Sequence, residues 1–316
     1  MSALPAPALD PRLAARLRVA LRTWFALHGR PLTFRVGPDA WGVLVSEVMA
    51  QQTQISRVEP AWAAFMERFP TPAALAAASP AAVLRQWAGM GYNRRALNLQ
   101  AAATAIEERH GGRVPATVPE LEALPGVGPY TARAVAAIAY GVPVAAVDTN
   151  VRRVVGRVLV GHGAHGDPGE PLRPNVLQAA ADALVDPADP GGWTHAVMDI
   201  GATLCRPATP RCEACPLAAW CRRAAQGDAG VAHTVGAGRR RAAPDPGVPF
   251  PRTRRWLRGR IVERLRGLPE GAWTLIEGPI GEHDPDAVAA AVADLIAEGL
   301  IEARPDGAVR LPSTRR

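Results

Sequence analysis

The sequence contains no lysine, so all 36 of its lysine-plus-arginine positions are arginines. Lysine is the residue that forms Schiff bases, anchors pyridoxal phosphate and reaches the phosphates of a P-loop. These three kinds of site are therefore excluded. Arginine keeps its charge at physiological pH, so the basic residues can bind anions but cannot act as amine nucleophiles.

Cysteine is also scarce, and its four copies are confined to residues 205–221. The disulfides of a secreted domain would be spread along the chain, so we expect a cytoplasmic protein. No run of eighteen apolar residues occurs. This absence excludes a membrane-spanning helix and predicts no membrane partner.

The chain that remains is globular in composition and basic. It has 316 residues, of which 48% are hydrophobic and 21% charged, a length that suggests about two domains. The net charge is +7, and residues 239–266 alone carry ten arginines against two acids. Such a run is either a solvated arm or a phosphate-binding one, and nucleic acid is the usual anionic partner.

Hydrophobic periodicity predicts an all-α body and a smaller α+β domain. Helices are expected at 11–28, 41–55, 59–69, 94–110, 118–123, 131–140, 149–160, 175–184 and 192–205. Thr71-Pro72 and Ser79-Pro80 each predict a further helix start, with Thr or Ser as N-cap and proline at the first helical position. We assign residues 1–225 to the helical domain, 226–251 to a basic flexible linker and 252–316 to a small winged-helix-like domain. In this small domain we expect helices at 255–267 and 286–298, and strands at 273–276, 300–303 and 308–311.

A glycine pair separates two of the expected helices. Gly126, Val127 and Gly128 follow the helix that ends near Ala123 and precede the one at 131–140. Two glycines one residue apart allow a tight turn whose free N–H groups, with the helix N-terminus, bind phosphate. A Gly-x-Gly pair alone is a weak signal, but helices on both sides favour a helix–hairpin–helix, which contacts DNA backbone without reading sequence.

The four cysteines have the spacing Cys205-x6-Cys212-x2-Cys215-x5-Cys221. Four thiolates in one short segment can bind a tetrahedral metal or a cubane cluster. Structural zinc usually takes two close C-x-x-C pairs, and here only the middle pair is close. The spacing therefore favours an iron–sulfur cluster, with zinc and a metal-free loop as the alternatives.

Two acidic residues have surroundings suited to acid–base chemistry. Glu47 lies in an apolar helical segment, where burial raises the pKa of a carboxyl group and keeps it protonated, as a general acid requires. Asp148 lies at an expected helix N-cap, where backbone N–H groups favour a negative charge. One acid and one carboxylate can cleave a glycosidic bond. Considered singly, each has a simpler explanation: a partly exposed helix residue and an ordinary cap.

Together these features resemble the helix–hairpin–helix (HhH-GPD) iron–sulfur DNA glycosylases over roughly residues 20–225. Within that superfamily three strings look like the A/G-specific adenine DNA glycosylases of the MutY type. They are Ser46-Glu47-Val48-Met49-Ala50-Gln51-Gln52-Thr53-Gln54, Gly89-Met90-Gly91-Tyr92 and Gly126-Val127-Gly128-Pro129-Tyr130-Thr131. The resemblance implies an all-α fold of two helical subdomains with a cluster loop.

The resemblance also implies catalytic roles. Glu47 would protonate the purine of the extruded base, and Asp148 would stabilise the sugar cation. Tyr130 and Asn150 would position these groups. The related endonuclease III enzymes carry a catalytic lysine where this chain has Tyr130, so the implied enzyme is monofunctional.

Binding roles follow from the same resemblance. Gln52 and Tyr92 would fill the space left by the flipped adenine. Phe34, Arg35 and Ala50 would line the base pocket. The implied DNA contacts are Gly126, Val127, Gly128 and Arg153, and the implied [4Fe-4S] ligands are Cys205, Cys212, Cys215 and Cys221.

The implied function is removal of adenine mispaired with 8-oxoguanine or guanine in double-stranded DNA, by a monomer acting at the nucleoid. Phe34 and Ala50 depart from the family pattern, and this motivates an alternative in which thymine or uracil opposite guanine is removed. A non-catalytic iron–sulfur DNA-binding protein is a further alternative, against which the presence of both Glu47 and Asp148 argues. Residues 252–316 are shorter than the Nudix-like domain of well-known members.

Overall fold

The computed structural model describes residues 10–37, 39–162, 172–226 and 248–314. The chain divides into two compact units. Of the described residues, the first unit holds those up to Leu44, Ala116–Ala123 and those from 127 to 226. The second holds Val45–Pro115, Leu124–Gly126 and those from 248 to 314. Most of the expected 226–251 linker, with the arginines at 239–241, lies outside the described residues.

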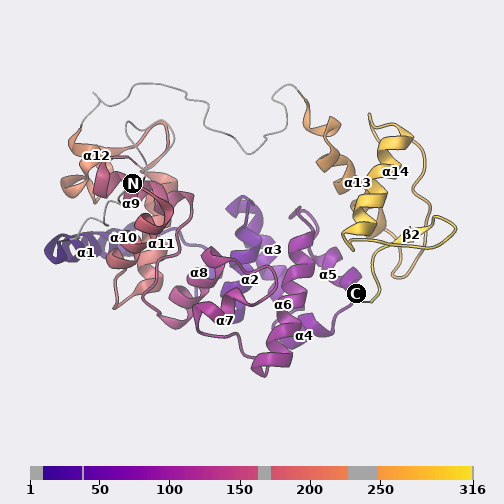
Figure 1. Cartoon of the computed structure of the whole chain (residues 1–316), viewed down its shortest axis with the longest axis horizontal. Helices are drawn as coiled ribbons and strands as arrows, with labels where there is room; N and C mark the ends of the chain where they lie inside the picture. The colour runs from indigo at the N-terminus through magenta and orange to yellow at the C-terminus, as the bar shows by residue number, and fades with distance from the viewer. Residues whose placement is uncertain (1–9, 38, 163–171, 227–247, 315–316) are drawn as a thin grey trace, which may run out of the picture. The chain divides into compact units, whose positions relative to one another are not determined.

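The first unit is helical, and its helices begin at strong N-terminal signals. Its elements are α1 (Pro11–His28), the 3₁₀ turn Thr33–Arg35, α7 (Val118–Glu122), α8 (Pro129–Tyr140), α9 (Thr149–Val160), α10 (Pro174–Leu184), α11 (Pro190–Thr203) and α12 (Arg222–Ala225). Several start with a capping side chain followed by proline, as at Asp10-Pro11 and Asp189-Pro190. Figure 1 shows α1, α9, α10 and α11 gathered together, and their buried faces form one core.

The second unit begins within α2 (Ala40–Ala50), which crosses the boundary between the units. It continues with α3 (Ile55–Arg68), α4 (Pro72–Ala77), α5 (Pro80–Gln86) and α6 (Arg94–His110). Its core contains Trp87 and Phe65, both fully buried with their rings edge to face at 5.8 Å between centroids. The expected starts at Thr71 and Ser79 are confirmed, since both hydroxyls accept a hydrogen bond from the backbone three residues on.

The break between the second and third helices lies earlier than periodicity predicts. The pattern predicts one helix over 41–55 and another from 59, whereas α2 ends at Ala50 and α3 starts at Ile55. The interruption is at Gln52, whose backbone adopts a positive φ of 55°. A left-handed residue ends a helix, and nothing in a glutamine side chain indicates it.

The C-terminal segment is an α+β arrangement, as expected, with less strand than predicted. Its helices are α13 (Arg254–Arg266) and α14 (Pro285–Ala297), followed by the hairpin β1 (Glu302–Ala303) and β2 (Val309–Arg310). The strand expected at 273–276 is reduced to one bridge between Thr274 and Val309. This segment belongs to the same unit as α3–α6, and Figure 1 shows α13 beside α14. None of the described helices is long and apolar enough to cross a membrane.

Candidate active site

Helix α2 presents one carboxyl group from an otherwise buried surface. Val45, Ser46, Val48 and Met49 are all at most 4% exposed, whereas Glu47 is half-buried. The Glu47 side chain therefore keeps some access to a ligand, while the residues beside it along the helix are buried. A carboxyl group with this access can reach a bound base, as a general acid must.

Asp148 is held in place by hydrogen bonds to both carboxylate oxygens. As expected, it caps α9: its Oδ1 accepts a hydrogen bond from the N–H of Val151 at 2.7 Å. Its Oδ2 accepts one from the side-chain amide of Asn150 at 2.8 Å. The carboxylate is thereby oriented before any substrate arrives, and Asn150 is its positioning partner.

Asn150 is in turn fixed from two sides. Arg153 donates a hydrogen bond to its Oδ1 at 2.8 Å, and Gly201 of α11 lies against it. A Cβ added at Gly201 would come within 2.5 Å of the Asn150 Cβ. The close approach of α11 to α9 thus requires glycine at this position.

Gly201→Ala is expected to displace Asn150 and reduce excision. Overpacking of this kind costs about 1–3 kcal/mol of stability, and the shift also moves the Asp148 carboxylate. Thermal unfolding and single-turnover base release would measure the two effects separately. Excision at the wild-type rate in a folded Gly201→Ala protein would show that the position of Asn150 does not matter.

Arg153, which we expected at the DNA surface, is buried at 6% exposure. Its guanidinium donates to the backbone oxygens of Cys205 and Gly201 at 2.5 and 2.6 Å, as well as to Asn150. Burial lowers its pKa, and the charge of Arg157 acts in the same direction. Arg153 therefore links the Asp148 cap to the start of the cysteine loop (residues 205–221) instead of facing solvent.

The glycine hairpin has the expected conformation. Gly126 has a φ of 76°, Gly128 is the N-cap of α8, and Pro129 is the first helical residue. A Cβ at Gly126 would come within 2.6 Å of the Asn98 Cβ, so glycine is required for space as well as for its φ. Tyr130 follows in the first turn of α8, with its hydroxyl 3.9 Å from the Met198 sulfur.

Gln52 and Tyr92 share a backbone feature. Among the described residues they are the two non-glycine residues with positive φ, at 55° and 46°. Strained backbone of this kind persists where surrounding structure holds it, and it is concentrated at functional positions. Both side chains are exposed, Tyr92 at 42%.

The residue that holds both loops is Arg95, which no sequence pattern singles out. Its guanidinium donates to the backbone oxygens of Val48, Met49, Met90 and Gly91 at 2.8–3.2 Å. These acceptors lie at the end of α2, just before Gln52, and in the loop that carries Tyr92. Burial lowers the pKa of Arg95 to about 10, so it stays charged at neutral pH.

The three residues expected to line the base pocket differ in their burial and in their hydrogen bonds. Phe34 is buried, and Arg35 donates to both oxygens of Asp199, at 2.9 and 3.0 Å. Asp199 is fully buried and also binds Arg30, at 2.6 Å. Burial acts to raise the pKa of Asp199, but hydrogen bonds from Arg35 and Arg30 outweigh it and the net shift is downward.

Ala50, the third expected pocket residue, is half-buried at the last position of α2.

Beside Asp199, His195 has its pKa lowered to about 3, first by burial and then by the charge of Arg35. It is therefore a neutral structural group. Asp199 was not selected from the sequence, because its partners Arg30 and Arg35 lie far from it along the chain.

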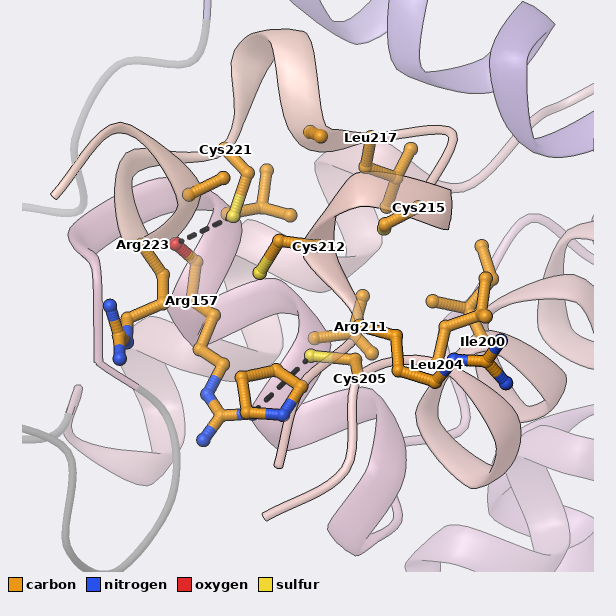
Figure 2. Close-up of a pocket in the computed structure, with 15 residues that line it drawn as sticks. Arg157, Ile200, Leu204, Cys205, Arg211, Cys212, Cys215, Leu217, Cys221 and Arg223 are labelled. Atoms are coloured by element: carbon orange, nitrogen blue, oxygen red, sulfur yellow. Dashed lines mark hydrogen bonds between the residues drawn. The ribbon is translucent and has the colours of Figure 1, made fainter. Parts of the chain in front are cut away.

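The four cysteines line one cavity, as Figure 2 shows. Arg157, 2% exposed, donates to the Cys205 sulfur at 3.6 Å, and the Cys221 thiol donates to the Arg157 backbone oxygen at 3.4 Å. Burial raises the pKa of the Cys215 thiol to about 12. Arg157 and Arg223 both line the cavity, and burial raises the pKa of the Cys212 thiol although the charges of these two arginines act to lower it.

Helices on both sides of a glycine hairpin, with a four-cysteine loop, define a class of DNA glycosylase. Residues 45–168 match the HhH-GPD superfamily of base excision DNA repair proteins. A solved thermostable thymine-DNA glycosylase covers 68% of this chain and 98% of its own, with a TM-score of 0.61 and 26% identity. An endonuclease III–DNA complex has the same fold, with a TM-score of 0.55, 24% identity and coverage of 67% and 97%.

Sequence relatives narrow the class. The adenine DNA glycosylase of Mycolicibacterium smegmatis is 40% identical over 92% of this chain and 94% of its own length. The human adenine DNA glycosylase is 41% identical over 65% of this chain and 39% of its own length. The chain belongs to the adenine DNA glycosylase family.

Proposed function

We propose that this DNA glycosylase hydrolyses the N-glycosidic bond of adenine mispaired with 8-oxoguanine or guanine. The observation that carries the proposal is the pair of carboxyl groups: Glu47 half-buried among apolar side chains, and Asp148 with both oxygens hydrogen-bonded. Adenine excision is the activity in the names of the relatives. Repair of chromosomal DNA places the site of action at the nucleoid.

In the proposed mechanism Glu47 gives its proton to a ring nitrogen of the extruded adenine. The glycosidic bond then breaks with its electron pair passing to the purine, and Asp148 stabilises the positive charge left on the sugar. Water adds to the sugar carbon, and its proton returns to Glu47. Asn150 positions Asp148 through the hydrogen bond at 2.8 Å, and the family resemblance gives Tyr130 a positioning role as well.

The proposed reaction leaves the DNA strand intact. An enzyme that cuts the backbone through an imine needs an amine at the sugar carbon, and a lysine is the usual donor. The sequence has none. The family resemblance places Tyr130 where endonuclease III has its lysine. The product is therefore an abasic site.

For DNA binding we propose the glycine hairpin and the two strained loops. The backbone N–H groups of Gly126, Val127 and Gly128 would bind a phosphate. Gln52 and Tyr92 would occupy the space vacated by the extruded base. Both stand on strained backbone of the kind found at functional positions, and Arg95 holds the adjoining backbone through its hydrogen bonds. Arg153 supports the cysteine loop from within.

The cysteine set fits a [4Fe-4S] cluster, with Cys205, Cys212, Cys215 and Cys221 as ligands. All four line one cavity. Structural zinc usually takes two close C-x-x-C pairs, whereas only the Cys212–Cys215 pair is close here, so the spacing favours the cluster over zinc. The cluster would shape the loop and contribute nothing to bond cleavage.

Cys212→Ser is expected to lower iron and sulfide content and to weaken duplex binding, while helix content is largely kept. The reason is that the core beside α9 and α11 takes Leu217 from the cysteine loop and otherwise residues outside the loop, and Cys212 is not part of that core. Metal analysis, fluorescence anisotropy and circular dichroism would check the three parts. Unchanged iron in Cys212→Ser would show that this thiol is not a ligand.

The experiment for the function is a panel of duplexes with A·8-oxoguanine, A·G, T·G and U·G pairs. Incubation with the purified protein followed by alkali converts abasic sites to strand breaks. We expect cleavage at A in the first two duplexes. The likeness to a thymine-DNA glycosylase makes T·G excision the second candidate, and cleavage confined to T·G or U·G would replace adenine as substrate.

A further inference from the structure

Helix α13 forms one wall of a groove whose other wall carries Gln52 and Tyr92. The groove has a volume of about 870 Å³ and is lined by residues 51–52, 89–95 and one face of α13. All of these belong to the same compact unit. The proposed mechanism assigns no role to α13 or to the rest of the C-terminal segment.

The groove is strongly basic. Eight arginines and two glutamates line it. The two glutamates are already engaged: Glu298 binds Arg258 at 2.8 Å, and Glu263 binds Arg266 at 3.2 Å. Among the described residues Arg255 forms no salt bridge, and its guanidinium lies over the Tyr92 ring at 4.4 Å from the centroid. Positive charge beside an exposed aromatic ring suits a strand with phosphates and stackable bases.

The face of α13 that lines the groove carries a glycine, which leaves space in the groove. At 3.6 residues per turn Arg255, Gly259 and Arg266 share the groove face, whereas Arg264 lies on the opposite side. A Cβ at Gly259 would meet no atom within 4 Å. Glycine inside a helix costs about 1 kcal/mol relative to alanine, and here it leaves room where a side chain would fill the groove.

Hydrogen bonds fix this wall to the helical part of the same unit. Arg266 donates to the backbone oxygen of Leu84 and to the Asn93 side chain, both at 2.8 Å. The Ala81 N–H donates to the Pro312 oxygen at 2.9 Å. Asn93 directly follows Tyr92, so the C-terminal segment is attached to the loop that carries the aromatic ring.

We propose that this groove binds a strand of the DNA substrate, with the α13 arginines, Arg255 above all, contacting backbone phosphates beside Tyr92. The C-terminal segment is then part of the DNA-binding surface. This inference rests on the proposed function for its choice of DNA as ligand. Binding is measured without excision, so a failure of either proposal can be told from a failure of the other.

The test compares three variants of the full chain by fluorescence anisotropy on a labelled duplex over a range of salt concentrations. Arg255→Gln removes a charge from the groove, and Arg264→Gln removes the same charge from the opposite face. Gly259→Leu narrows the groove without changing charge. Thermal unfolding confirms that each variant is folded.

Arg255→Gln is expected to weaken binding about three- to tenfold and to reduce the slope of log K against log salt by roughly one phosphate contact. Gly259→Leu should weaken binding to a similar extent, and Arg264→Gln less than about twofold. Equal losses in Arg255→Gln and Arg264→Gln would overturn the proposal, because only overall charge would then matter. Wild-type affinity in Gly259→Leu would overturn it as well.

Competition identifies the occupant. Unlabelled DNA of the same sequence is expected to displace the labelled duplex from the wild type more effectively than from Arg255→Gln. Poly-glutamate, an acidic protein-like chain, is expected to compete poorly with both. Competition by poly-glutamate that depends on Arg255 as strongly as DNA does would contradict DNA as the ligand.

Discussion

Glu47→Gln is expected to abolish measurable adenine excision, with a loss of about 10²–10⁴-fold in single-turnover rate. Glutamine has nearly the shape of glutamic acid but carries no acidic proton. The half-buried position on α2 tolerates the exchange, because the surrounding side chains are unchanged. Duplex affinity should stay within about twofold of the wild type, since the lost proton acts on the base and not on the backbone.

Glu67→Gln is the matched control for this variant. Glu67 lies exposed on α3, in the same unit as Glu47. Its replacement should leave both excision and binding at wild-type levels. Undiminished excision in Glu47→Gln would remove Glu47 from the mechanism, and a loss of duplex binding equal to the loss of rate would make its role structural.

Asp148→Asn is expected to reduce excision by about 10²–10³-fold, the cost of removing one preorganised charge from a transition state. Asparagine caps helices as well as aspartate does, so its side-chain oxygen can still accept the Val151 N–H. The Asn150 amide loses its acceptor Oδ2, so the free energy of unfolding should fall by about 1 kcal/mol. What is lost is the negative charge that stabilises the sugar cation.

Asp189→Asn is the control for this variant, because it removes the charge of a helix cap outside the candidate catalytic residues. Asp189 caps α11 with the same geometry, its Oδ1 accepting the Gly192 N–H at 2.8 Å. We expect wild-type excision from this variant. If Asp148→Asn excises adenine at the wild-type rate, its carboxylate is an ordinary cap; if its melting temperature falls far below that of Asp189→Asn, the rate loss has a structural cause.

The sequence predicted most helix boundaries because capping is a local property. Asp148, Thr71 and Ser79 carry their signal in the side chain that accepts the N-terminal N–H. The early end of α2 was not predictable in the same way. It depends on a left-handed Gln52, which Arg95 supports through hydrogen bonds from a helix that lies further along the chain.

The sequence predicted the motifs of the candidate site but not the residues that hold these motifs in place. Glu47 and Asp148 were selected because an acid in apolar surroundings and an acid at a cap have recognisable neighbours. Arg153 was expected among the DNA contacts because the family resemblance implied that role. Its burial is matched by hydrogen bonds to the carbonyl oxygens of Gly201 and Cys205, which reach it only in the folded chain.

The most direct test of the central claim is to follow both strands of an A·8-oxoguanine duplex with the purified full chain. Free adenine should appear in step with alkali-sensitive sites, while the strand remains intact until alkali is added. Release of adenine with an intact strand is the predicted result. Failure to release adenine, or enzymatic strand cleavage at the rate of base release without alkali, would contradict it.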